Sequence, residues 1–223
     1  MIDKIKSSPP LTIAIEGING SGKTTLIGKL KEILVKEGIE PVELPYKKTE
    51  SYKKAISATS DIKDKLFIEA FKESYKEVFP NLKANNILIM DRFLLSNFVY
   101  RTIDGYKLDP KEQYDKLLDL GNGEKMKVDT FIYLDCNPNL AYKRIIDRGE
   151  DRFKNEYLEL ETLEKARTLF IDYYYKLVED YKDSMFFLTQ TSKFNFFRKY
   201  RKFINNVYSN RFKIEKVQPF CYF

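Results

Sequence analysis

The sequence predicts an α/β fold in which a five-stranded parallel sheet carries helices on both faces. Short apolar runs alternate along the chain with longer segments of helical periodicity, which is typical of strands joined by helical crossovers. Two of the runs, NILIM and TFIYL, are continuously apolar, as expected for strands buried on both faces. The strands are expected at residues 12–15, 40–44, 86–90, 130–134 and 185–188.

Helices are expected where apolar residues recur every three or four positions. The first follows the first strand, and Gly38 lies just past its end, as is common at a helix C-terminus. The second ends before Pro80, which cannot continue a helix. The expected helices are residues 23–36, 61–79, 139–147, 157–181 and 193–208.

Length and composition indicate one globular domain over residues 1–223. Its core is expected at about 11–208, with a lid at about 148–156 and a basic, aromatic tail at 209–223. Lys and Arg number 39 against 33 Asp and Glu, and the net charge of +6 suits small polyanions without requiring nucleic acid.

Composition excludes several kinds of chemistry. The chain has no histidine, so histidine bases, triads and metal ligands are excluded. No apolar window approaches 18 residues and residues 1–10 lack the apolar stretch of a secretory signal, so neither a membrane span nor export is expected. Cys136 lies in an apolar stretch, and a reduced thiol there favours a cytoplasmic protein.

The run EGINGSGKTT at residues 16–25 fits G-x-x-x-x-G-K-[ST] between a strand and a helix. Its glycines let successive N–H groups face phosphate oxygens, and the helix N-terminus adds positive partial charge. Lys23 is expected to reach the β- and γ-phosphates of ATP, and Thr24 to hold Mg²⁺. The predicted ATP-binding loop residues are Gly17, Asn19, Gly20, Ser21, Gly22, Lys23, Thr24 and Thr25.

Asp91 and Arg92 follow the third predicted strand. Ligands of open α/β sheets bind beyond the carboxyl ends of the strands, so both side chains should emerge near the phosphate loop. The carboxylate is suited to Mg²⁺ or its water, and the arginine to a transferring phosphoryl group. A surface ion pair is the alternative interpretation.

Arginines surround Gly149 after the third predicted helix, residues 139–147. Arg144, Arg148 and Arg152 suggest a lid that closes over the phosphates and excludes water. The alternative is a solvated charge cluster between helices.

Four blocks together, EGINGSGKTT, DRFLLSNFVY, YLDCNPNLAYKRIIDRGEDRF and NEYLELETLEKARTLFIDYY, resemble the thymidylate kinases over residues 11–188. The resemblance implies a P-loop kinase fold with an arginine-containing lid, ATP and Mg²⁺ as cofactors, dTMP as the phosphate acceptor, and a homodimer. The catalytic residues it implies are Lys23, Asp91, Arg92, Arg148 and Arg152. It adds Arg144 to the ATP site and implies that Thr24 and Asp91 hold the metal. The implied acceptor site comprises Glu16, Lys47, Phe67, Phe71, Arg92, Ser96 and Tyr100.

Three positions depart from the pattern of that family. Asn19 replaces a carboxylate of the phosphate loop, and Phe71 replaces an arginine one turn after the stacking ring expected at Phe67. Lys47 or Lys48 stands near the position of an arginine that the family tends to place before the proline after the second strand.

Other functions stay open at this point. A deoxynucleoside kinase shares the loop and sheet but phosphorylates a sugar hydroxyl, and therefore needs a base, for which Glu43 is the candidate. A noncatalytic nucleotide-binding protein is favoured by Asn19 and Phe71. The basic segment from Lys193 onward is expected to close the sheet as an amphipathic helix, and nucleic acid is not expected as a partner. The alternative is that this segment contacts nucleic acid or an acidic membrane, as in a nucleic-acid-binding P-loop protein.

Overall fold

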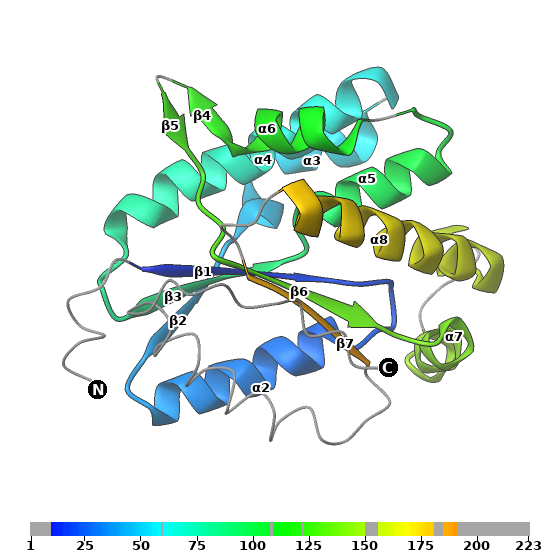
Figure 1. The fold of residues 1–223 in the computed structure, drawn as a ribbon, viewed down its shortest axis with the longest axis horizontal. Coiled ribbons are helices and arrows are strands. Elements are labelled where there is room, and N and C mark those ends of the chain that lie inside the picture. Colours follow the sequence, from blue (N-terminus) through cyan, green and yellow to red (C-terminus); the bar gives the residue numbers. More distant parts are fainter. Residues whose placement is uncertain are drawn as a thin grey trace.

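A computed structural model of the chain describes residues 10–58, 60–107, 109–121, 123–149, 156–180 and 185–190. Within these residues, five parallel strands form one sheet in the order β2-β3-β1-β6-β7 (Figure 1). The strands are β1 (Leu11–Glu16), β2 (Glu40–Glu43), β3 (Asn86–Asp91), β6 (Thr130–Asp135) and β7 (Met185–Gln190). The predicted five-stranded parallel sheet is therefore confirmed, with strand bounds within two residues of those expected.

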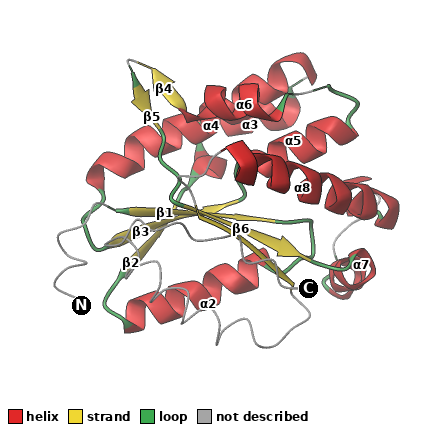
Figure 2. Cartoon of the chain, in the orientation of Figure 1, coloured by secondary structure: helices red, strands yellow, loops and turns green. Residues whose placement is uncertain are grey.

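Helices cover both faces of this sheet (Figure 2). On one face lies α2 (Lys23–Lys36), whose bounds match the prediction. On the other lie α4 (Ser60–Val78), α5 (Leu94–Ile103), α6 (Pro110–Leu118) and α8 (Leu160–Asp180). The predicted helix at 139–147 corresponds to α7 (Pro138–Asp147), which follows β6.

Several short elements were not predicted. They are α3 (Glu50–Ser57), the hairpin of β4 (Asp119–Gly121) with β5 (Glu124–Lys125), and the 3-10 turns η1 (Tyr46–Lys48), η2 (Phe79–Asn81) and η4 (Glu156–Leu158). Two of the larger helices, α5 and α6, were also missed. The turn η4 takes the first residues of the helix expected at 157–181, so α8 begins only at Leu160.

Side chains alternate between the two faces of the sheet along each strand, so the protein has two hydrophobic cores, one on each face. Successive strand residues point to opposite faces, so Ile13, Ile15 and Ile89 join one cluster while Ala14 and Met90 join the other. The first cluster contains residues of α2, and the larger second one residues of α4, α5, α6 and α8. Both faces of the central strands are therefore buried, which explains their continuously apolar sequence.

The strand order places the phosphate loop at the carboxyl ends of the central strands. From β1 the chain first builds β3 and β2 on one side, and later β6 and β7 on the other. This reversal lies beside β1, whose carboxyl end leads into the phosphate loop. Arg152, most of the expected lid and the segment from residue 191 onward lie outside the described residues. None of the described helices combines the length and apolarity that crossing a membrane requires.

Candidate active site

The phosphate loop between β1 and α2 is packed so closely that two glycines are obligatory. A Cβ on Gly17 would lie 2.7 Å from the carbonyl oxygen of Leu134, and one on Gly20 would lie 2.4 Å from that of Ala141. Gly20 also has φ +74°, a conformation that residues with a Cβ rarely adopt. The loop therefore rests directly on β6 and α7.

The start of α2 is prepared for an anion. Lys23 is only 7% exposed, and its Nζ donates to the carbonyl oxygens of Gly17 and Ile18 at 2.8 Å each. Burial, reinforced by the charge of Arg92, lowers the pKa of Lys23 well below its ordinary value. In the described part of the chain, no side chain caps this helix end and its first turn holds no acidic residue. Both features favour a bound phosphate group.

Arg92 is directed at the same loop. Its Nη1 donates to the carbonyl oxygen of Gly17 at 3.1 Å and to Ser96 Oγ at 2.9 Å, and its Nη2 donates to Asn19 Oδ1 at 2.6 Å. The guanidinium also lies 5.4 Å from the centre of the Tyr100 ring. All three hydrogen-bond acceptors are neutral, so none of them forms an ion pair with Arg92.

Glu16 lies beneath the site rather than in it. The side chain is fully buried and accepts hydrogen bonds from the backbone N–H groups of Phe93 and Ser96 at 2.8 and 3.2 Å, and from the Ser96 hydroxyl. Burial raises the pKa of this carboxyl. Glu16 thus caps the start of α5 from a distant strand. It is not among the residues that line the neighbouring cavity, where the resemblance had implied it would bind the acceptor.

The residues expected to hold Mg²⁺ suit an ion that arrives with phosphate. Asp91 Oδ2 is 3.0 Å from Lys47 Nζ, whereas its Oδ1 is buried and has no hydrogen-bond partner among the described residues. Thr24 is exposed in the first turn of α2. No cluster of three or more His, Cys, Asp or Glu side chains in the described ranges is placed to hold a metal. One carboxylate and one hydroxyl fit an ion that is mainly ligated by phosphates and water.

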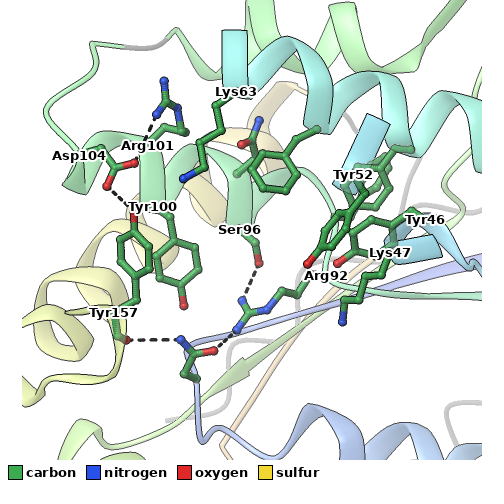
Figure 3. Close-up of a pocket in the computed structure, with 15 residues that line it drawn as sticks. Tyr46, Lys47, Tyr52, Lys63, Arg92, Ser96, Tyr100, Arg101, Asp104 and Tyr157 are labelled. Carbon is green, nitrogen blue, oxygen red and sulfur yellow. Dashed lines mark hydrogen bonds and ion pairs between the residues drawn. The ribbon is translucent and has the colours of Figure 1, made fainter. Parts of the chain in front are cut away.

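A cavity of about 350 Å³ opens beside Arg92 (Figure 3). Seven predicted residues line it: Asn19, Lys47, Phe67, Phe71, Arg92, Ser96 and Tyr100. Eight other lining residues were not predicted from the sequence: Tyr46, Tyr52, Lys63, Phe93, Asn97, Arg101, Asp104 and Tyr157. Three of these, Asn97, Arg101 and Asp104, belong to or follow α5, and their spacing of four and three residues is that of one helix face.

Aromatic rings form one wall of the cavity. Phe71 is buried and stacks on Tyr46, with centroids 4.1 Å apart and ring planes at 21°. Phe67 is half-buried and meets Tyr52 edge-on at 5.7 Å. The position at which the family carries an arginine is therefore part of an aromatic stack. The wall suits a flat, apolar ring such as a nucleobase.

A polar chain closes the cavity on the other side. Arg101 forms ion pairs with Asp64 and with Asp104, the latter at 3.3 Å, and Asp104 accepts a hydrogen bond from the Tyr157 hydroxyl. The carbonyl oxygen of Tyr157 in turn accepts from Asn19 Nδ2 at 3.4 Å. Asn19 accepts from Arg92 at the same time, and a carboxylate at this position would lack the donor for Tyr157.

The arginines of the expected lid are not all gathered at the site. Arg144 Nη1 donates to the carbonyl oxygen of Gly20 at 3.3 Å, so this side chain lies against the phosphate loop. Arg148 is exposed at the end of α7 and is not among the residues that line the cavity. Ser21 is buried and Thr25 exposed, and both lie at the loop and helix start as predicted.

The described fold and site define a class of protein. A phosphate loop at the switch point of a parallel sheet, an arginine aimed at that loop and an aromatic cavity beside it are typical of P-loop nucleotide kinases. A family model described as thymidylate kinase matches residues 15–199. The chain belongs to the thymidylate kinase family.

Individual relatives agree with this assignment. The chain is 30% identical over 176 residues to the thymidylate kinase of Leptospira borgpetersenii, covering 74% of this chain and 82% of the relative. It is 32% identical over 181 residues to that of Leptospira interrogans, with the same coverage. A probable thymidylate kinase of Archaeoglobus fulgidus is 29% identical over 172 residues, covering 73% of this chain and 81% of the relative.

Solved structures support the fold. A deoxyadenosine kinase from M. mycoides with the products dCMP and dCDP superposes with a TM-score of 0.58 at 23% identity, covering 89% of this chain and all of that one. The same enzyme with bound dCTP gives a TM-score of 0.56 at 21% identity, again over 89% of this chain and all of that one.

Proposed function

We propose that this protein is a nucleoside-monophosphate kinase that transfers the γ-phosphoryl group of Mg·ATP to dTMP, giving ADP and dTDP. The observation that carries the proposal is Arg92, a cation with neutral hydrogen-bond partners that links the phosphate loop to an aromatic cavity. An acceptor with a phosphate at one end and a flat base at the other fits both parts of this site.

The donor is bound by the loop and by the start of α2. ATP phosphates accept hydrogen bonds from the backbone N–H groups of residues 17–25, and Lys23 exchanges its two carbonyl partners for β- and γ-phosphate oxygens. Arg144, which already contacts the loop, adds positive charge near the phosphates. Mg²⁺ held near Thr24 and Asp91 supplies charge neutralisation when bound.

The acceptor is bound in the cavity. Its phosphate faces Arg92 with Lys47 nearby, and its base lies against Phe67, in a cavity that Phe71 and Tyr100 also line. Ser96 acts indirectly, because its hydroxyl accepts from Arg92 and donates to Glu16. Catalysis then consists of positioning, charge stabilisation by Arg92 and the lid arginines Arg148 and Arg152, and exclusion of water.

Among the described residues, no carboxylate that lines the cavity is free to act as a base, which supports a phosphate acceptor over a hydroxyl acceptor. Glu43, the candidate base of a deoxynucleoside kinase, forms an ion pair with Lys31 and does not line the cavity. Asp104 does line it, but its two oxygens already bind Arg101 and Tyr157. A monophosphate is ionised at neutral pH and requires no base, so it is the acceptor that this cavity suits better.

The proposal is tested by ADP release from Mg·ATP with dTMP, dUMP, dCMP, dGMP, thymidine or no acceptor. Turnover with dTMP and none with thymidine is expected. Turnover with thymidine alone would assign the protein to the deoxynucleoside kinases. ATP binding without turnover of any acceptor would indicate a noncatalytic member of the family.

Assembly and location are further parts of the proposal. We expect a homodimer that forms through helices away from the active site. Light scattering at micromolar concentration tests this. A cytoplasmic location accords with Cys136, a buried free thiol.

A further inference from the structure

Four cationic side chains of the described residues line the cavity, and most of them already have hydrogen-bond or ion-pair partners. Lys47 pairs with Asp91, and Arg101 pairs with Asp64 and Asp104. Arg92 bonds to neutral oxygens at the phosphate loop, where the acceptor phosphate is expected. Lys63 is the remaining cavity-lining cation, and no described residue hydrogen-bonds to it or forms an ion pair with it.

Lys63 occupies the end of the cavity opposite the phosphate loop. Figure 3 shows its ammonium group directed inward beside Tyr100 and Arg101, whereas Lys47 and Arg92 lie on the other side. The side chain is half-buried. Phe67 follows it by four residues on α4, about 6 Å along the same helix face. If the acceptor base lies on Phe67, the ammonium is within reach of the edge of the base that points away from the sugar.

The chemistry at this end of the cavity is biased toward donors. An ammonium group has three donors and no acceptor. Asp104 is the one carboxylate among the described residues that line the cavity, and its two oxygens are occupied by Arg101 and Tyr157. A carbonyl oxygen on the base edge would satisfy Lys63, whereas an exocyclic amino group would place one donor against another in a partly desolvated site.

We propose that Lys63 is a specificity-determining residue, which selects pyrimidine monophosphates with a carbonyl oxygen on that edge, as in thymine and uracil, over cytosine. This inference rests on the proposed function. It assigns recognition of the base edge to Lys63, which lies one helical turn before Phe67 on α4, whereas Phe71 lies one turn after it.

The test compares kcat/KM for dTMP and dCMP in the full chain and in Lys63→Met, which keeps the apolar stem and removes the donor. The two acceptors carry the same phosphate and sugar but differ in the 5-methyl group as well as in the base edge. The dUMP/dCMP ratio is therefore measured in parallel, because these two acceptors differ only at that edge, and it should fall in the same way. We expect Lys63→Met to lower kcat/KM for dTMP about 10–100-fold, mainly through KM, as for loss of a hydrogen bond to a charged group. With dCMP the change should stay within about threefold, so the dTMP/dCMP ratio falls at least about tenfold.

Two further variants control for general effects. Lys65→Met removes the same charge from an exposed position on the same helix and should leave both values unchanged. Lys63→Arg keeps a cationic donor and should preserve the preference for dTMP. Equal losses with both acceptors, or an unchanged ratio in Lys63→Met, would overturn the inference.

Calorimetric binding of dTMP and dCMP separates this inference from the proposed function, because it requires no turnover. If the wild-type chain binds dTMP more tightly than dCMP and Lys63→Met abolishes the difference, Lys63 selects the base whether or not phosphoryl transfer follows. If the wild-type chain turns over dTMP and Lys63→Met retains the full binding preference, the activity stands and the role of Lys63 fails.

Discussion

Arg92 combines an unusual backbone with a central position in the site. Its φ of +69° is the one positive value among the non-glycine residues that the structure describes. A left-handed conformation costs a residue with a Cβ about 1–2 kcal/mol. The strain persists because the Arg92 N–H is bonded to the carbonyl oxygen of Ile15 and the side chain is held by three acceptors. This turn directs the guanidinium back over the phosphate loop, as expected where strain serves a function.

Replacing Arg92 should therefore reduce transfer more than it reduces stability. Arg92→Ala removes the charge and is expected to lower kcat by about 10²-fold or more, as for the loss of one transition-state donor. Arg92→Lys keeps the charge without the two-pronged geometry and should recover only part of the rate. Steady-state kinetics with dTMP measure both. A wild-type kcat in Arg92→Ala, with its fold verified by circular dichroism, would mean that Arg92 is structural.

Glu16 provides a prediction for pH dependence. Burial raises the pKa of its carboxyl in the folded protein above the ordinary value of about 4.5. The folded state then holds this proton more tightly than the unfolded state does. The resulting stabilisation is complete below about pH 4.5 and is lost as the pH rises through the higher folded pKa.

In Glu16→Gln the side chain cannot titrate, so the loss of stability with rising pH that Glu16 causes should disappear. The free energy of unfolding of the wild type, minus that of the variant, is expected to fall as the pH rises from about 4.5 toward 7. Urea denaturation at several pH values measures this difference, in which the contributions of all other carboxyls cancel. A difference that rises with pH would mean that the hydrogen bonds from Phe93 and Ser96 outweigh burial.

At the scale of elements, the phosphate loop depends on α7 for its shape. A Cβ on Gly20 would meet the backbone of Ala141, and backbone atoms cannot rotate away as a long side chain can. Gly20→Ala should displace the loop from α7, weaken ATP binding at least about tenfold and lower stability by more than about 1 kcal/mol. Gly38→Ala is the control, because Gly38 also has a positive φ but nothing lies near its Cβ position. Equal ATP affinity in the two variants would show that contact with α7 is unimportant.

The helices that were not predicted from the sequence, α3, α5 and α6, fall into two groups. The start of α5 is capped by Glu16, which lies about 77 residues earlier in the chain, so no local signal marks it. By contrast, α3 begins with Thr49, whose hydroxyl accepts from the Tyr52 N–H, and α6 begins with Asp109 capping Glu112. Both caps are local signals of a helix start that can be recognised in the sequence. The strands and α2 were predictable because their burial is fixed by apolar patterns alone.

At the scale of the whole molecule, the site too contains residues that local sequence marks and residues that only the packing of distant segments brings in. The phosphate loop, Asp91 and Arg92 were predictable, since each belongs to a contiguous motif at a strand end. Lys63 and Tyr157 were not, because they reach the cavity only through the packing of α4 and of the segment before α8 around it. The residues that bind phosphate are thus marked in the sequence, whereas those that surround the base are brought together by the fold.

A cavity assembled from distant segments should couple ligand binding to global stability. A ligand that binds only the folded state adds about 2.7 kcal/mol at 100 times its Kd, and 1 kcal/mol shifts Tm by about 2–4 °C in a chain of this size. Saturating dTMP should therefore raise Tm by about 5–10 °C. Thymidine, which lacks the phosphate that Arg92 is expected to bind, should shift Tm much less at the same concentration. In Arg92→Ala, the Tm shifts caused by dTMP and by thymidine should become similar. Thermal unfolding without ATP measures this apart from turnover, and equal shifts with dTMP and thymidine in the wild-type chain would contradict phosphate recognition by Arg92.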